Sequence, residues 1–125
     1  MVDREPVRIL GVDHVQVAAP AGCEAEARAF YSGVLGLEEL AKPEALATRG
    51  GCWFRAGAQE LHVGVEEPFA PARKAHPGLV VDALDELAAR LAAAGIEVTP
   101  DETIPGIARF HVADPFGNRL EVRQA

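Results

Sequence analysis

The chain repeats itself, because one pattern of a strand, a helix and three further strands occurs twice along its 125 residues. The stretches 14–60 and 76–121 are nearly equal in length, and each opens with a histidine and closes with a glutamate. In each stretch the glycine that ends the helix, Gly36 or Gly95, is followed by an apolar residue and then a glutamate. Self-similarity of this kind predicts two copies of one structural unit.

The first unit has the order β-α-β-β-β. Residues 11–17 alternate in polarity, which is typical of a strand and places His14 and Gln16 on one face and Val15 and Val17 on the other. Apolar residues at helical spacing predict a helix over 23–35, and Gly36 ends it. Three short strands are then predicted over 37–40, 51–56 and 59–65.

The second unit follows the same order. A strand-like run begins near His76, and Pro77 predicts that this strand starts late or lies at a sheet edge. A helix is predicted over 82–95, with Asp82 as its cap and Gly95 as its end. Its apolar stripe consists of Leu84, Leu87, Ala88 and Leu91. Strands are predicted over 96–99, 108–112 and 119–123, the last two joined by a turn over 114–118.

Length and composition favour one domain with a real core, because 49% of the residues are apolar. We expect a first module over about 8–66, a linker over 67–75 that contains Pro68 and Pro71, and a second module over about 76–125. The two cysteines, Cys23 and Cys52, have neither metal-knuckle spacing nor the density of a disulfide framework. We therefore predict that both are buried free thiols.

The distribution of charged and apolar residues excludes some classes of binding partner. The net charge is −7, and the chain has two lysines and no basic run, which argues against a nucleic-acid surface. No apolar stretch is long enough to span a membrane, and the N-terminus lacks the apolar core of a secretory signal. We expect a cytoplasmic protein that acts on a small molecule, either a substrate or a drug, without a nucleic-acid or membrane partner.

Four polar side chains occupy matching places in the two units. His14 and His76 open them, and Glu60 and Glu121 close them. Alternation sets Glu121 opposite the apolar residues beside it, and the same reasoning places His14 on a polar face. If both units turn these faces inward, two imidazoles and two carboxylates converge. This donor set suits a divalent Zn, Ni, Co, Mn or Fe ion and leaves positions open for substrate oxygens.

Five segments together resemble the vicinal oxygen chelate superfamily, which includes glyoxalase I, fosfomycin-resistance transferases, extradiol dioxygenases and bleomycin-resistance proteins. They are Gly11-Val-Asp-His14, Phe30-Tyr31-x-x-Val-Leu-Gly36-Leu, Ala75-His76, the helix over 82–95, and Asp114-Pro-Phe-Gly-Asn-Arg-Leu-Glu121. The resemblance covers nearly the whole chain. It implies an α+β fold in which two βαβββ modules form a curled, cup-shaped mixed sheet around a divalent metal.

The resemblance also implies which residues hold the metal. His14, His76 and Glu121 match the family's ligand positions. The fourth position falls on Glu60 or His62, which share a strand face, and the repeat spacing favours Glu60. His111 lies outside the repeated pattern and is not expected to be a ligand.

The presence of both glutamates favours a metal-dependent lyase or isomerase of the glyoxalase type, in which Glu60 or Glu121 acts as general base. Two alternatives remain open at this point. One is a bleomycin-resistance-like protein that sequesters a ligand without catalysis, and the other is an extradiol-type dioxygenase. Modules of this kind commonly pair across a homodimer, although pairing within one chain would leave the same strand pattern.

Overall fold

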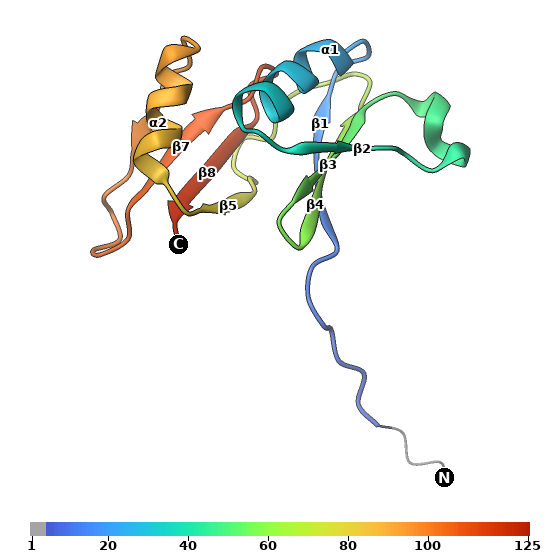
Figure 1. The fold of residues 1–125 in the computed structure, drawn as a ribbon. Helices are drawn as coiled ribbons and strands as arrows, with labels where there is room; N and C mark the ends of the chain where they lie inside the picture. The colour runs from blue at the N-terminus through green and yellow to red at the C-terminus, as the bar shows by residue number, and fades with distance from the viewer. Residues whose placement is uncertain (1–4) are drawn as a thin grey trace.

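The computed structural model describes residues 5–125 and shows an α+β fold with two four-stranded mixed sheets (Figure 1). The first sheet has the order β1-β4-β3-β2, with β1 (His14–Ala19), β4 (Gln59–Val65), β3 (Cys52–Ala56) and β2 (Glu38–Leu40). The second has the order β5-β8-β7-β6, with β5 (Gly78–Val81), β8 (Arg119–Gln124), β7 (Arg109–Ala113) and β6 (Thr99–Pro100). The first and last strands of each unit pair in parallel, so the repeat predicted from the sequence is also a repeat in topology.

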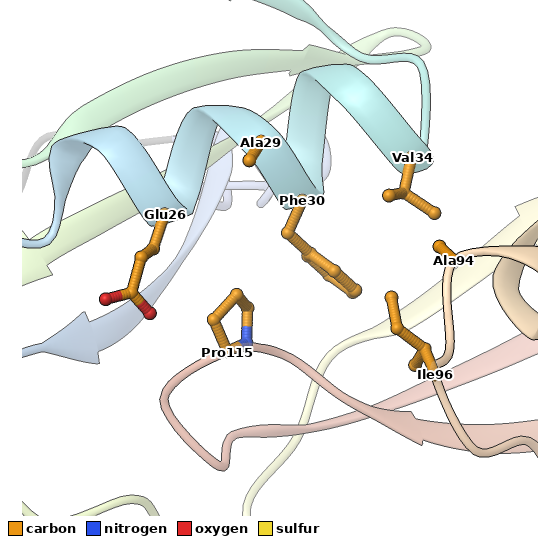
Figure 2. Close-up of a pocket in the computed structure, with 7 residues that line it drawn as sticks. All are labelled: Glu26, Ala29, Phe30, Val34, Ala94, Ile96 and Pro115. Atoms are coloured by element: carbon orange, nitrogen blue, oxygen red, sulfur yellow. The ribbon is translucent and has the colours of Figure 1, made fainter.

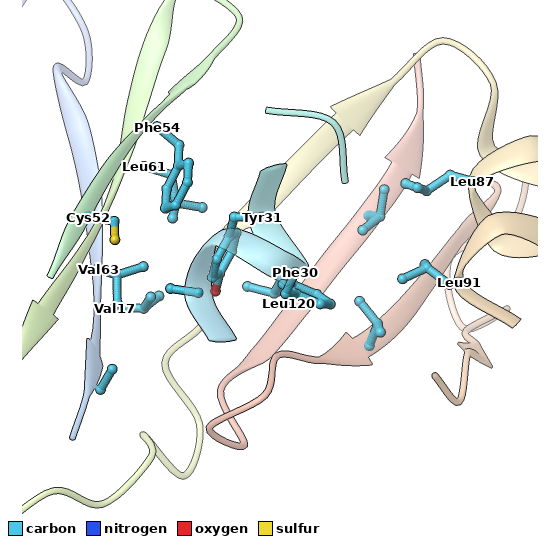
Figure 3. Packing of buried hydrophobic residues seen from close by; sticks show 14 of the residues in the cluster. Val17, Phe30, Tyr31, Cys52, Phe54, Leu61, Val63, Leu87, Leu91 and Leu120 are labelled. Atoms are coloured by element: carbon cyan, nitrogen blue, oxygen red, sulfur yellow. The ribbon is translucent and has the colours of Figure 1, made fainter. Parts of the chain in front are cut away.

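The first helix begins as α1 (Glu24–Ala27) and continues as the π-helical segment η1 (Arg28–Val34). Gly36 then takes a φ of 76°, a left-handed conformation that glycine adopts readily and that ends the helix where predicted. This helix lies between the two sheets (Figure 3). Phe30 and Tyr31 project from it into a core that both sheets share, and both side chains are buried.

The second helix, α2 (Leu84–Ala93), packs its predicted stripe into the core. Leu84, Leu87 and Leu91 are buried there. The predicted cap at Asp82 is wrong, because the helix starts after Ala83 and no side chain of that segment caps it. Instead, the backbone N–H of Leu84 donates to the Oε1 atom of Gln124 in β8, at 2.9 Å. A side chain from the distant strand β8 thus accepts a hydrogen bond from a backbone N–H that the first turn of α2 leaves unpaired.

Several strands begin or end at residues other than those predicted. β5 starts at Gly78 rather than near His76, because Pro77 has no N–H to donate, and it forms a sheet edge as expected. β1 starts at His14 rather than at residue 11. The strand predicted over 96–99 is reduced to β6, since the N–H of Ile96 bonds back to the carbonyl of Leu91. The 3-10 helix η2 (Glu44–Arg49) was not predicted.

The turn over 114–118 joins the two modules. The buried Tyr31 hydroxyl donates to Asp114 Oδ2 at 2.7 Å, and burial beside this carboxylate raises the Tyr31 pKa. Asn118 Nδ2 donates to the carbonyl of Ala18 in β1 at 2.7 Å. Asp114 and Asn118, which belong to the last of the five family-like segments, therefore tie the second sheet to the helix and first strand of the first module.

Residues 5–125 also bear on the predictions for the two cysteines and for membrane-spanning segments. Cys23 and Cys52 are buried free thiols, as predicted, and lie 2% and 1% exposed. None of the helices in this range combines the length and the apolar character that crossing a bilayer requires.

Candidate metal centre

Three side chains on the open face of the second sheet lie close enough together to share an ion. His76, His111 and Glu121 each offer one donor atom, and these atoms all lie within 4.8 Å of one another. His111 pairs directly with Glu121 across the β7–β8 ladder, and Gly78, two residues after His76, pairs with Glu121 from the other side. Within residues 5–125 no other set of three such side chains is this compact.

The local sequence explains why these groups face the same way. Leu120 and Val122 on either side of Glu121 are buried in the core, so Glu121 points to the opposite face. His111 stands in the same relation to the buried Phe110 and Val112. The shared polar face is thus a consequence of strand alternation in β7 and β8.

His76 is oriented by the backbone just before β5. Its Nδ1 lies 2.8 Å from the carbonyl oxygen of Lys74, which can only accept, so Nδ1 carries the proton. Arg119 Nη2 lies 3.0 Å from His76 Nδ1 and 3.3 Å from the Lys74 carbonyl oxygen. The Lys74 carbonyl therefore accepts hydrogen bonds from both His76 and Arg119. The unprotonated Nε2 of His76 is then directed to the site, 3.8 Å from Glu121 Oε1.

An arginine lies against the carboxylate of this cluster. Arg109 Nη1 donates to Oε1 of Glu121, and Arg109 Nη2 lies 3.1 Å from Oδ2 of Asp101. Hydrogen bonds from the backbone and hydroxyl of Thr103, and one from His111, hold the Asp101 pKa well below its usual range. Arg119 lies beside His76 on the same face, so two carboxylates and two guanidinium groups surround the cluster.

The residues present fit a divalent metal. Two imidazoles and a carboxylate form a donor set that Zn, Ni, Co, Mn and Fe(II) accept. In addition, Nδ1 of His111 is buried and has no hydrogen-bond partner, although unpaired buried acceptors are costly. An ion near this nitrogen would satisfy it.

The first sheet holds the other predicted ligands. His14 and Glu60 pair in register on β1 and β4, and Nε2 of the buried His62 lies 2.9 Å from Glu60 Oε1. The His62 ring stacks between His14, at a centroid distance of 4.2 Å, and Trp53, at 3.9 Å. His62 is thus enclosed by rings, whereas the Glu60 side chain stays 33% exposed. This arrangement favours Glu60 over His62 as an accessible donor.

The four residues predicted to converge are not gathered within one chain. His76 and Glu121 come together on the second sheet, whereas His14 and Glu60 lie on the first and belong to no such set in the described part of the chain. The physical reason is that η1 occupies the space between the sheets and draws their apolar faces toward each other (Figure 3). The polar faces consequently belong to separate half-sites.

Sequence reasoning left out His111, because its counterpart in the first unit is not a histidine. The pairing partner of Glu60 on β3 is Arg55, whereas the pairing partner of Glu121 on β7 is His111. The turn predicted over 114–118 is the sequence feature that could have identified His111 as a neighbour of Glu121. Residues 111 and 121 are equally far from Phe116 at its tip, so a tight hairpin places them side by side.

Two hollows in the described part of the chain differ in character. A cleft of about 570 Å³ between the modules is lined mainly by apolar side chains of β1, β4 and β5, and Glu60 is one of its lining residues. A smaller apolar hollow of about 260 Å³ lies between η1 and the end of α2, around Phe30, Val34 and Ile96 (Figure 2). Neither of these two hollows is lined by His76, His111 or Glu121, and Glu60 is the one candidate ligand that borders the larger cleft.

Comparison with known proteins points to one family. The family model described as Glyoxalase/Bleomycin resistance protein/Dioxygenase superfamily matches residues 11–122, whereas no curated protein matches the chain. A Bacillus anthracis protein structure assigned to the glyoxalase family is 54% identical, with a TM-score of 0.93 over 96% of this chain and 98% of that one.

Two more distant structures share the fold. Lactoylglutathione lyase from Agrobacterium tumefaciens is 24% identical, with a TM-score of 0.73 over 94% of this chain and 95% of that chain. The fosfomycin resistance protein FosX from Listeria monocytogenes is 15% identical, with a TM-score of 0.75 over the same shares. The arrangement of two βαβββ units is therefore shared among proteins with different names.

Proposed function

Because the chain belongs to the Glyoxalase/Bleomycin resistance protein/Dioxygenase superfamily, we propose that it is a metal-dependent lyase or isomerase of the glyoxalase type. Its substrate is a small molecule with two adjacent oxygens. The observation that carries this proposal is the compact set of donor atoms from His76, His111 and Glu121 on an open sheet face. A protein that only sequesters a ligand has no need for such a set.

The proposed ligands are His76 and Glu121 from the second sheet and His14 and Glu60 from the first. When bound, a divalent ion would supply positive charge and open positions for the two substrate oxygens, which stabilises negative charge that develops on them. The side chains of the chain itself orient the ion. His76 is directed by the Lys74 carbonyl, and Glu121 is held by Arg109.

A homodimer would bring the two half-sites together. The strands β1 and β5 are the edges of their sheets, and each exposes apolar side chains: Val15 of β1 is 38% exposed and Val80 of β5 is 63% exposed. Unpaired edges with apolar side chains are typical of surfaces that meet a partner. In the proposed dimer, His14 and Glu60 of one copy face His76 and Glu121 of the other.

Glu60 is the proposed general base. Its Oε1 is held by His62 at 2.9 Å, and the other carboxylate oxygen is left to take a proton from the substrate. Such a step removes a proton from a carbon beside a carbonyl and returns it to the neighbouring carbon. Glu121 is the second candidate, and its Oε1 already accepts a hydrogen bond from Arg109.

One observation supports a second candidate function. Two histidines and one carboxylate on one face form the donor type used by non-haem iron oxygenases, which leaves several positions open for substrate and oxygen. An extradiol-type cleavage of a catechol would use His14, His76 and Glu121 with an iron ion. Metal identity separates the two candidates.

The decisive experiment measures metal content per chain by mass spectrometry, before and after exposure to Zn, Ni, Co, Mn and Fe(II). We expect about one tightly held ion per chain, and weaker binding in Glu121→Gln. The matched control is Glu86→Gln, which removes a carboxylate from the exposed face of α2. We also expect Glu60→Gln to impair metal binding more than His62→Gln.

Loaded protein is then assayed with hemithioacetals, epimerisable acyl thioesters and catechols. Turnover of either of the first two supports the lyase or isomerase proposal, and cleavage of a catechol with iron supports the oxygenase. A protein that retains no metal under any of these conditions contradicts both, and it would direct the search to sequestered aromatic drugs. The stacked Trp53 is the only tryptophan, so its fluorescence reports ligand binding at the first sheet directly.

A further inference from the structure

We propose that His111 is a metal ligand, so that His76, His111 and Glu121 give the second sheet three donors of its own for the ion. Asp101 acts as a positioning residue that orients His111. This inference rests on the proposed metal dependence and extends it, because neither residue was among the ligands expected from the sequence.

The first argument is geometric. Donor atoms that share a zinc ion at 2.0–2.3 Å lie roughly 3–4 Å apart. The donor atoms of the three side chains already lie within 4.8 Å of one another, so small side-chain rotations close the set. The His76 and His111 rings are also edge to face, with centroids 5.9 Å apart, which lets both approach one point without a clash.

The second argument concerns the proton on His111. Its Nε2 lies 2.8 Å from Asp101 Oδ2, an oxygen that also faces the Arg109 guanidinium and accepts hydrogen bonds, so Nε2 is the donor. Nδ1 is then an unprotonated acceptor, and it is the buried nitrogen that has no hydrogen-bond partner. A histidine that gives one N–H to a carboxylate and keeps its other nitrogen for a metal is a recurring ligand arrangement.

The third argument is that Asp101 is itself held firmly. The Thr103 backbone N–H and hydroxyl donate to Asp101 Oδ1 at 3.0 and 2.7 Å. Arg109 Nη2 contacts the other oxygen, Oδ2, at 3.1 Å. A carboxylate with this many partners fixes the ring of His111 rather than following it. A purely structural His111–Asp101 pair would not need to leave the other ring nitrogen of His111 buried and without a partner.

The test uses full-length, metal-free protein titrated with Co(II), and its readout is the visible absorption spectrum together with Zn(II) affinity from chelator competition. We expect His111→Ala to lower Zn(II) affinity at least tenfold and to change the Co(II) spectrum, because a nitrogen donor is lost. Asp101→Asn should lower affinity by roughly 10- to 100-fold. Its matched control, Glu102→Gln, removes a neighbouring exposed carboxylate and should change affinity less than twofold.

The double variant His14→Ala/Glu60→Gln separates this inference from the proposed function. We expect it to keep a Co(II) complex, and adding His111→Ala to it should abolish that complex. If the wild type binds metal and His111→Ala leaves both affinity and spectrum unchanged, His111 is not a ligand, although the proposed function stands. If the wild type binds neither metal, the proposed function and this inference both fail. Circular dichroism of each variant verifies that it is folded.

Discussion

Replacing Tyr31 with Phe removes one hydroxyl from the junction between the modules. The Tyr31 side chain is fully buried, and its hydroxyl donates to Asp114 Oδ2 at 2.7 Å. The same oxygen accepts from Asn118 Nδ2 at 2.9 Å, while the backbone N–H groups of Phe116 and Asn118 donate to the other oxygen. The variant therefore leaves a buried carboxylate with three of its four donors.

The loss of one of these four hydrogen bonds sets the expected decrease in the free energy of unfolding. A hydrogen bond to a charged group contributes about 1.5–3 kcal/mol, and phenylalanine fills the space of the ring, so no large cavity forms. Because Asn118 still serves the same oxygen, we expect the lower part of that range, about 1.5–2 kcal/mol. For a domain of this size, that corresponds to a fall in Tm of about 6–8 °C.

Thermal and urea unfolding at one fixed protein concentration measure this change, since a dimer would make stability depend on concentration. Thr48→Val is the control, because it removes a hydroxyl from an exposed position in η2. The double variant Tyr31→Phe/Asn118→Ala should lose more than the sum of the two single variants, as Asp114 Oδ2 then has no donor. A Tyr31→Phe Tm within about 1 °C of the wild type would refute the reasoning.

Two further predictions concern the first module. Gly51 has a φ of +83°, and a Cβ there would lie 2.1 Å from the carbonyl oxygen of Val63, so Gly51→Ala should cost at least about 3 kcal/mol or prevent folding. Gly57 has a φ of +63° but open space around it, so Gly57→Ala should cost only about 1–2 kcal/mol by urea unfolding, and equal losses would contradict the steric argument. Burial raises the Cys23 pKa to about 12, so a disulfide reagent should label the native chain slowly. Raising the pH from about 7 to about 9 should accelerate this labelling about 100-fold, compared with about 25-fold for a free thiol with an ordinary pKa near 8.5, whose ionisation approaches completion over this range. Rapid native labelling, with the unfolded chain as reference, would show that this thiol is exposed.

Local patterns in the sequence determined much of the fold. The alternation in β8 correctly placed Glu121 on the face opposite Leu120 and Val122, which are buried in the core. Gly36 and Gly95 correctly marked the helix ends, since their left-handed backbone conformations are a property of single residues. These features depend on neighbours within a few positions, and the sequence therefore contains enough information to predict them.

The tertiary structure decided the features that depend on distant neighbours. Gln124 rather than Asp82 satisfies the start of α2, because β8 ends beside it. The sequence also could not show that η1 lies between the sheets and separates the polar face of His14 and Glu60 from that of His76 and Glu121. His111 joins this second face through the register of the β7–β8 pair, while Asp101 reaches it from outside both strands. Strand alternation determines which way a side chain points, but only the packing of the sheets and loops determines what it meets there.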